Sequence, residues 1–131
     1  MRLVVDSSSD LPKEIIEKHN IHVVPLTVSI DGDDYQDGVD ITSTEFYARL
    51  ENSINAPKTS QVVPEQFIEA FTKILNEDEE IICITIGSAA SGTCQSAFLA
   101  KEEVDSERIS IIDSNGLCMG TGYLAIIAAN M

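Results

Sequence analysis

The sequence predicts an α/β fold in which a mainly parallel sheet is flanked by helices, with a short hairpin near one edge of the sheet. Two observations lead to this prediction. Residues 81–86 are continuously apolar and mostly β-branched, which is typical of a strand covered on both faces. From that run onward, strand and helix patterns alternate along the chain, and this rhythm favours right-handed parallel crossovers.

The chain is expected to open with a strand and a helix. The short apolar run at residues 3–5 indicates a buried strand. Ser9 or Asp10 is expected to cap the helix that follows, with Pro12 in its first turn, where a missing N–H costs nothing. Asn20 is expected to end that helix.

A strand and a hairpin are predicted next. Apolar residues alternate over residues 24–30, so one face of this strand should be buried. Pro25 cannot donate a ladder hydrogen bond, which places the strand toward an edge. Asp31-Gly32 suits a type I′ turn, with a short return strand through Tyr35.

Two helices follow, separated by a loop. Thr42 and Glu45 have the spacing of a capping box at a helix start. Residues 55–61 are expected to form a loop. Phe67 and Phe71 then fall at helical spacing, and we interpret them as ordinary core residues.

The second half of the chain continues the alternation. A turn at residues 87–93 follows the buried strand, and a helix through residues 97–99 follows the turn. Residues 108–113 are expected to form another strand. A further helix is expected from Gly116 onward.

Composition narrows the classes of function. The formal net charge is −14, from 8 basic and 22 acidic side chains. Such an acidic surface argues against nucleic-acid binding and against stable membrane docking, so only transient membrane contact is expected. Any site for an anion must therefore be local and built from neutral donors.

The cysteines and the apolar segments indicate a cytoplasmic protein without a metal site. Cys83, Cys94 and Cys118 form no C-x-x-C pair and suggest neither a disulfide framework nor a zinc site. The opening apolar run is too short for a secretory signal. The longest apolar stretch, residues 117–129, is shorter than the roughly 20 residues that span a bilayer.

Three loops rich in hydroxyls and small residues are expected to meet at the carboxyl edge of the parallel sheet, where helix N-termini present free N–H groups. They are residues 6–10, 87–93 and 113–116. Thr59 and Ser60 can join them if their loop folds over. Hydroxyls can hold an anion without the desolvation cost of a buried cation, so this edge is a candidate anion site.

Two other kinds of chemistry have to be weighed for the turn at residues 87–93, nucleotide binding and catalysis by a serine nucleophile. The turn resembles a P-loop that lacks its lysine, which argues against a nucleotide. Ser91 caps the next helix and could act as a nucleophile, but the first glycine of G-x-S-x-G is absent. Nothing in the sequence brings His19 or His22 near Ser91 to act as its base. A serine-dependent acyl hydrolase or transferase, with its base supplied from elsewhere, and an anion-binding α/β domain remain open alternatives.

Four sequence blocks, taken together, resemble the DegV family, whose members are bacterial fatty-acid-binding proteins. Each block is weak alone, but the ordered set is specific and covers nearly the whole chain. The blocks are D-S-S-S-D-L-P at residues 6–12, K-T-S-Q at residues 58–61, S-G-T-C-Q-S-A at residues 91–97, and Asp113-Ser114.

The resemblance implies a lipid-binding protein and not an enzyme. It implies that hydroxyls of Thr59 and Ser91 hold the carboxylate of a long-chain fatty acid, with Ser60, Gly92 and Thr93 as neighbours. It implies no catalytic residue, and no cofactor besides the bound fatty acid. The carrier would present this ligand to a separate fatty acid kinase, which phosphorylates it to an acyl-phosphate for phospholipid synthesis.

Members of the family are longer and carry a second α/β domain. We therefore expect residues 1–131 to be an N-terminal α/β domain, truncated before a C-terminal domain that is largely absent. Two local departures from the family pattern lie beside the implied binding hydroxyls. Cys94 stands where an aromatic residue often follows S-G-T, and Val62-Val63 follow T-S-Q where proline and serine are commoner. Both can alter the shape of the pocket without removing the donors.

Overall fold

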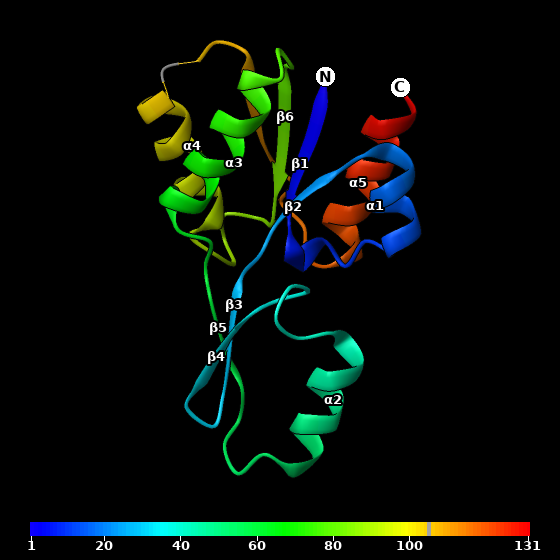
Figure 1. The fold of residues 1–131 in the computed structure, drawn as a ribbon, viewed down its shortest axis with the longest axis vertical. Helices are drawn as coiled ribbons and strands as arrows, with labels where there is room; N and C mark the ends of the chain where they lie inside the picture. The colour runs from blue at the N-terminus through cyan, green and yellow to red at the C-terminus, as the bar shows by residue number, and fades with distance from the viewer. Residues whose placement is uncertain (105) are drawn as a thin grey trace.

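The computed structural model describes residues 1–104 and 106–131 and contains two sheets (Figure 1). One is a four-stranded parallel sheet in the order β2-β1-β6-β7, and the other is a three-stranded antiparallel sheet in the order β4-β3-β5. The predicted α/β class is confirmed. The strands are β1 (Arg2–Asp6), β2 (His22–Val24), β3 (Thr27–Ile30), β4 (Asp33–Gln36), β5 (Lys58–Ser60), β6 (Ile81–Thr85) and β7 (Ile109–Asp113). The helices are η1 (Ser7–Ser9, a short 3₁₀ helix), α1 (Lys13–His19), α2 (Ser43–Asn52), α3 (Pro64–Asn76), α4 (Thr93–Val104) and α5 (Met119–Asn130).

Helices cover both faces of the parallel sheet, with α3 and α4 on one face and α1 and α5 on the other (Figure 1). Successive side chains of a strand point to opposite faces. Val4 therefore packs with Phe67 and Phe71 of α3, whereas Val5 packs with Ala125 of α5. The predicted core role of the two phenylalanines is confirmed, since both are fully buried.

A smaller lobe, built from β3, β4, α2 and β5, extends from the parallel sheet (Figure 1). Asp31 and Gly32 both have positive φ, 48° and 92°, as the predicted type I′ turn requires. The predicted capping box is also present. Thr42 Oγ1 accepts from the Glu45 N–H at 3.2 Å, and the Glu45 carboxylate accepts from the Thr42 N–H at 3.0 Å.

The single strand predicted over residues 24–30 is two strands in two sheets. Pro25 lies at the break between β2 and β3, because a residue without an N–H cannot continue a ladder. The predicted buried face is nevertheless confirmed, since Val24 and Val28 are both buried. The predicted edge position is confirmed for β2, which ends the order of the parallel sheet.

Two further local predictions are wrong. The expected loop at residues 55–61 contains β5, which pairs with β3 although its side chains are all exposed. Neither Ser9 nor Asp10 caps α1. Pro12 itself precedes the first helical residue without a side-chain cap, because the preceding serines form η1. Asn20 ends α1 in the left-handed conformation as predicted, with φ of 51°.

Candidate anion-binding site at the carboxyl edge of the sheet

The loop after β1 is fixed to the loop after β6 by a buried carboxylate. Asp6, at the end of β1, is completely buried. Its Oδ2 accepts from the Ile86 N–H at 2.7 Å, and its Oδ1 accepts from the Ser8 N–H at 3.0 Å. Hydrogen bonds to a charged acceptor are stronger than neutral ones, so Asp6 holds both loops at this edge.

The loop after β7 is fixed to the same turn. Asp113 Oδ1 accepts from the N–H groups of Ser88 at 3.1 Å and Asn115 at 2.9 Å. The Ser88 side chain contributes most to lowering the pKa of Asp113, and the backbone N–H groups of Asn115 and Ser88 lower it further. A Cβ on Gly87 would lie 3.1 Å from the backbone nitrogen of Gly116, so this position accommodates a close backbone approach. The predicted gathering of the three loops is confirmed.

Ser91 and Gly92 lead into α4, whose first residue is Thr93. Ser91 Oγ accepts from the Thr93 N–H at 3.2 Å and lies 3.0 Å from Thr93 Oγ1. Ser91 is half-buried, whereas Thr93 is fully buried. The predicted capping role of Ser91 is confirmed, and its hydroxyl lies at the positive end of the α4 dipole.

The segment that contains Gln61 and Val62 lies directly against this helix start. The Val62 N–H donates to Thr93 Oγ1 at 3.2 Å. A Cβ on Gly92 would lie 2.1 Å from Gln61 Oε1, so a larger residue here would displace the Gln61 amide from its position against the helix start. Sequence reasoning missed Gln61 as a packing partner, although it belongs to the same K-T-S-Q block as Thr59.

The structure places Thr59 and Ser60 on β5, close to this junction. Both are exposed, and Thr59 is opposite Val28 in the sheet register. Thr59 also lines a cavity of about 240 Å³ together with Phe46 and Tyr47 of α2. Within the described residues, the hydrogen bonds of the Ser91 hydroxyl join it to Thr93 and not to Thr59.

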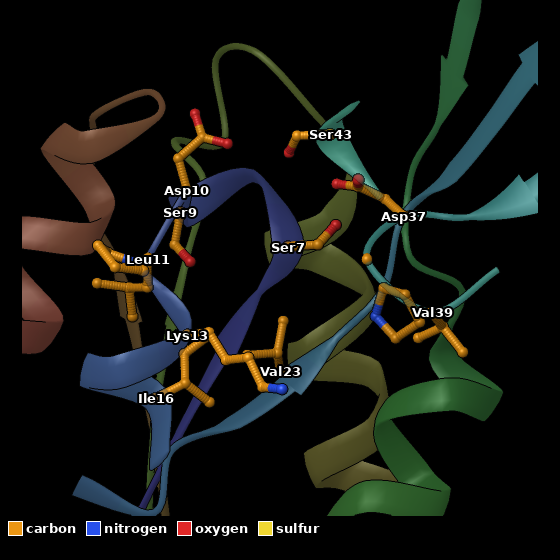
Figure 2. A pocket seen from close by; sticks show the side chains of 13 residues that line it. Ser7, Ser9, Asp10, Leu11, Lys13, Ile16, Val23, Asp37, Val39 and Ser43 are labelled. Atoms are coloured by element: carbon orange, nitrogen blue, oxygen red, sulfur yellow. The ribbon is translucent and has the colours of Figure 1, made fainter. Parts of the chain in front are cut away.

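A larger cavity, of about 600 Å³, opens between the start of α1 and the small lobe (Figure 2). Leu11, Ile16 and Val23 form an apolar part of its wall. Asp10 and Asp37 contribute carboxylates. The sequence did not predict this cavity, because its walls come from segments that are distant along the chain.

The histidines lie elsewhere. His22 lines a separate cavity of about 210 Å³ with Glu69 and Lys73, and burial, followed by the charges of Lys73 and Arg2, lowers its pKa. In the part of the chain that the structure describes, no histidine forms a hydrogen bond with Ser91. No group of three or more possible metal ligands occurs among residues 1–104 and 106–131.

An α/β fold with hydroxyl side chains at a helix N-terminus is typical of domains that bind small ligands. Comparison with known proteins gives the family. The chain belongs to the DegV family: the profile described as "Uncharacterised protein, DegV family" matches residues 1–131.

Several relatives carry informative descriptions. A DegV domain-containing protein of Caldanaerobacter subterraneus is 44% identical over 129 residues, which are 98% of this chain and 46% of that protein. A Thermus thermophilus structure described as "Fatty Acid Binding of a DegV family Protein" is 34% identical with a TM-score of 0.88, over 98% of this chain and 46% of that one. A stearic acid-binding protein from Eubacterium ventriosum is 35% identical with a TM-score of 0.88, over the same shares of the two chains.

The length of the chain sets it apart from these relatives, because it spans about half of each. Each of these relatives therefore contains a large part with no counterpart in residues 1–131.

Among the residues that the structure describes, no helix is both long enough and apolar enough to cross a bilayer.

Proposed function

We propose that this chain is the N-terminal α/β domain of a fatty-acid-binding protein and contributes the side that holds the ligand's carboxylate. The supporting observation is that Gln61, the last residue of the K-T-S-Q block, and Val62, which follows it, lie against the S-G-T block at the N-terminus of α4, in a fold shared with relatives described as binding fatty acids. Neutral donors suit this ligand because the chain carries a net charge of −14, from 8 basic and 22 acidic side chains.

The hydroxyls of Ser91 and Thr59 donate to the carboxylate in this proposal. Ser60, Gly92 and Thr93 are their neighbours. The N-terminus of α4 adds a favourable partial positive charge. Thr93 supports the arrangement indirectly, because its buried hydroxyl contacts both Ser91 and the backbone of residue 62.

The acyl tail supplies most of the affinity. Burial of each CH₂ contributes about 0.8 kcal/mol, whereas the hydroxyls fix the position of the head group. The carrier presents the bound acid to a separate fatty acid kinase, which forms the acyl-phosphate used in phospholipid synthesis. ATP binding and phosphoryl transfer belong to that kinase. The carrier works in the cytoplasm with only transient membrane contact.

Organic extraction of the purified protein followed by mass spectrometry tests the ligand. Protein expressed in bacteria should yield a long-chain fatty acid, and extracts without one would contradict the proposal. Thr59→Ala combined with Ser91→Ala should lower the amount retained while the fold stays intact. The matched control is Thr72→Ala with Ser110→Ala, which removes two exposed hydroxyls from α3 and β7.

Two outcomes would overturn parts of the assignment. Unchanged lipid content in the Thr59/Ser91 variant would show that other groups hold the carboxylate. A covalent acyl adduct on Ser91 after incubation with an activated acyl ester would instead indicate a serine-dependent acyl hydrolase or transferase.

A further inference from the structure

The glycine at residue 92 is explained by its neighbour and not by its own backbone. Gly92 does not have the positive φ that favours glycine, unlike Gly32 and Gly38. The three heavy atoms nearest to a Cβ on Gly92 all belong to the carboxamide of Gln61, with Oε1 at 2.1 Å, Cδ at 2.7 Å and Nε2 at 2.9 Å. This amide therefore occupies the space that a side chain at residue 92 would fill.

The Gln61 amide lies where the two proposed donor segments meet. Gln61 directly follows β5, two residues after Thr59, and Gly92 directly follows Ser91. The Nε2 of Gln61 also donates a long hydrogen bond, of 3.5 Å, to Oγ of the buried Ser96. The Ser96 N–H in turn donates to the Gly92 carbonyl at 3.0 Å, so the amide contacts the first turn of α4 at two places.

The side chain of Gln61 and the backbone after it hold the same junction. The next residue, Val62, donates its N–H to Thr93 Oγ1 at 3.2 Å. Gln61 is exposed, so no surrounding core fixes its amide, and its contacts with α4 are what order it. Since the hydrogen bonds of the Ser91 hydroxyl do not include Thr59, the separation of these two hydroxyls depends on the junction.

We propose that Gln61 is a positioning residue of the carboxylate site. Its carboxamide, seated on Gly92, sets the separation between the hydroxyls of Thr59 and Ser91. The inference rests on the proposed function for the ligand, whereas the contact itself needs none. A carboxylate can accept from both hydroxyls through its two oxygens only when their separation is right, but a fatty alcohol has a single oxygen and depends on it less. Gln61 therefore favours a fatty acid over the corresponding alcohol.

The first test needs no ligand. Amide hydrogen exchange followed by NMR reports how often the Val62 N–H leaves Thr93 Oγ1. Gln61→Ala should lower the protection factor of this N–H at least about fivefold, because the side-chain half of the junction is lost. The matched control is Gln95→Ala, which removes an exposed glutamine from α4. Unchanged protection in Gln61→Ala, or an equal fall in the control, would overturn the proposal.

Gly92→Ala tests the contact from the other side. The added methyl group displaces the Gln61 amide, and the fold should stay intact because the flexible end of that side chain can move away. Protection of Val62 should fall about as far as in Gln61→Ala, and the double variant should fall little further, since both changes remove one contact. Gly120→Ala is the control, because a Cβ there has nothing within 4 Å. Two effects that simply add would contradict the proposal.

Ligand selectivity tests the functional part. Each chain, freed of lipid, is titrated with lauric acid and with 1-dodecanol, which have chains of equal length, and urea midpoints are measured in parallel. The ratio of acid to alcohol affinity should fall at least about threefold in Gln61→Ala and in Gly92→Ala, with unchanged midpoints. A merely structural role would weaken both ligands together, and an unchanged ratio would overturn the positioning role.

The two proposals fail in different measurements. If the parent chain bound neither probe and its extracts held no fatty acid, the proposed function would be contradicted. The protection of the Val62 N–H would still decide whether Gln61 holds the junction, because that hydrogen bond forms within the chain itself.

Discussion

The backbone N–H of Val62 donates a 3.2 Å hydrogen bond to Oγ1 of Thr93, and this bond joins the residue directly after the K-T-S-Q block to the start of α4. The same Oγ1 lies 3.0 Å from the hydroxyl of Ser91. Thr93 is completely buried. One hydroxyl thus positions two segments that are about thirty residues apart in sequence.

Thr93→Val should weaken both the fold and the proposed carboxylate site. Valine keeps the shape of the side chain but leaves the Val62 N–H without its acceptor, which costs about 1–3 kcal/mol when the group is buried. Urea unfolding and the amount of extracted fatty acid measure the two effects. Thr93→Ser keeps the hydroxyl and is the control. A valine variant that matches the serine variant in both measurements would contradict this role.

Gly122 allows α5 to pack against η1, and Gly122→Ala tests that contact. A Cβ at this position would lie 2.4 Å from the backbone oxygen of Ser9, so alanine should destabilise the fold by about 1–3 kcal/mol through overpacking. Gly120 is on the same helix and has nothing within 4 Å of its Cβ position. Gly120→Ala should be neutral or stabilising, since alanine favours a helix. Thermal unfolding of both variants compares them, and equal midpoints would refute the contact.

Local signals account for the parts of the fold that the sequence predicted. The apolar run of β6 and the Thr42–Glu45 capping box each depend on residues close together in the chain, and both are present. By contrast, K-T-S of β5 has no apolar alternation. Its strand exists through pairing with β3, about thirty residues away, which no local pattern reports.

The candidate site likewise contains features that the sequence predicts and features that depend on long-range packing. The gathering of the loops around Asp6 and Asp113 follows from parallel topology, which the strand–helix alternation made predictable. The contact between Gln61 and Gly92 was not predictable, because it depends on how the small lobe leads back into α3. The cavity of about 600 Å³ beside Asp10 depends likewise on long-range packing.

His22 should make stability depend on pH on the acid side of neutrality. Burial, and then the positive charges of Lys73 and Arg2, lower its pKa below 6.5 in the folded chain. The unfolded chain therefore binds more protons between the two pKa values, so this contribution is complete above 6.5 and is lost as the pH falls through the folded pKa.

Urea midpoints at about pH 7.5 and about pH 5 measure the loss, and the His22→Gln chain should lose less over this interval. His19→Gln is the matched control, because it removes a histidine from the end of α1 and leaves His22 in place. If both variants lost as much stability as the parent, His22 would not be the group that titrates.

Cys118 should be the one thiol that reacts in the folded chain, and it should react slowly. Cys83 and Cys94 are buried, whereas Cys118 is exposed. Partial desolvation, followed by the nearby Asp10 carboxylate, raises the pKa of the Cys118 thiol and so lowers its thiolate fraction. Asp10→Asn should accelerate alkylation by iodoacetamide, measured by mass spectrometry. Slower labelling in that variant would contradict the electrostatic account.

The small lobe begins after β2 and leads into α3, and its two ends lie side by side. Thr27 and Ser60, its first and last strand residues, are paired across β3 and β5. Leu26 and Val62, just outside them, both belong to the core that packs against α3. The lobe therefore has the geometry of an insertion. Because its two ends are adjacent, it can be shortened or exchanged at one place without changing the pairing of the four parallel strands.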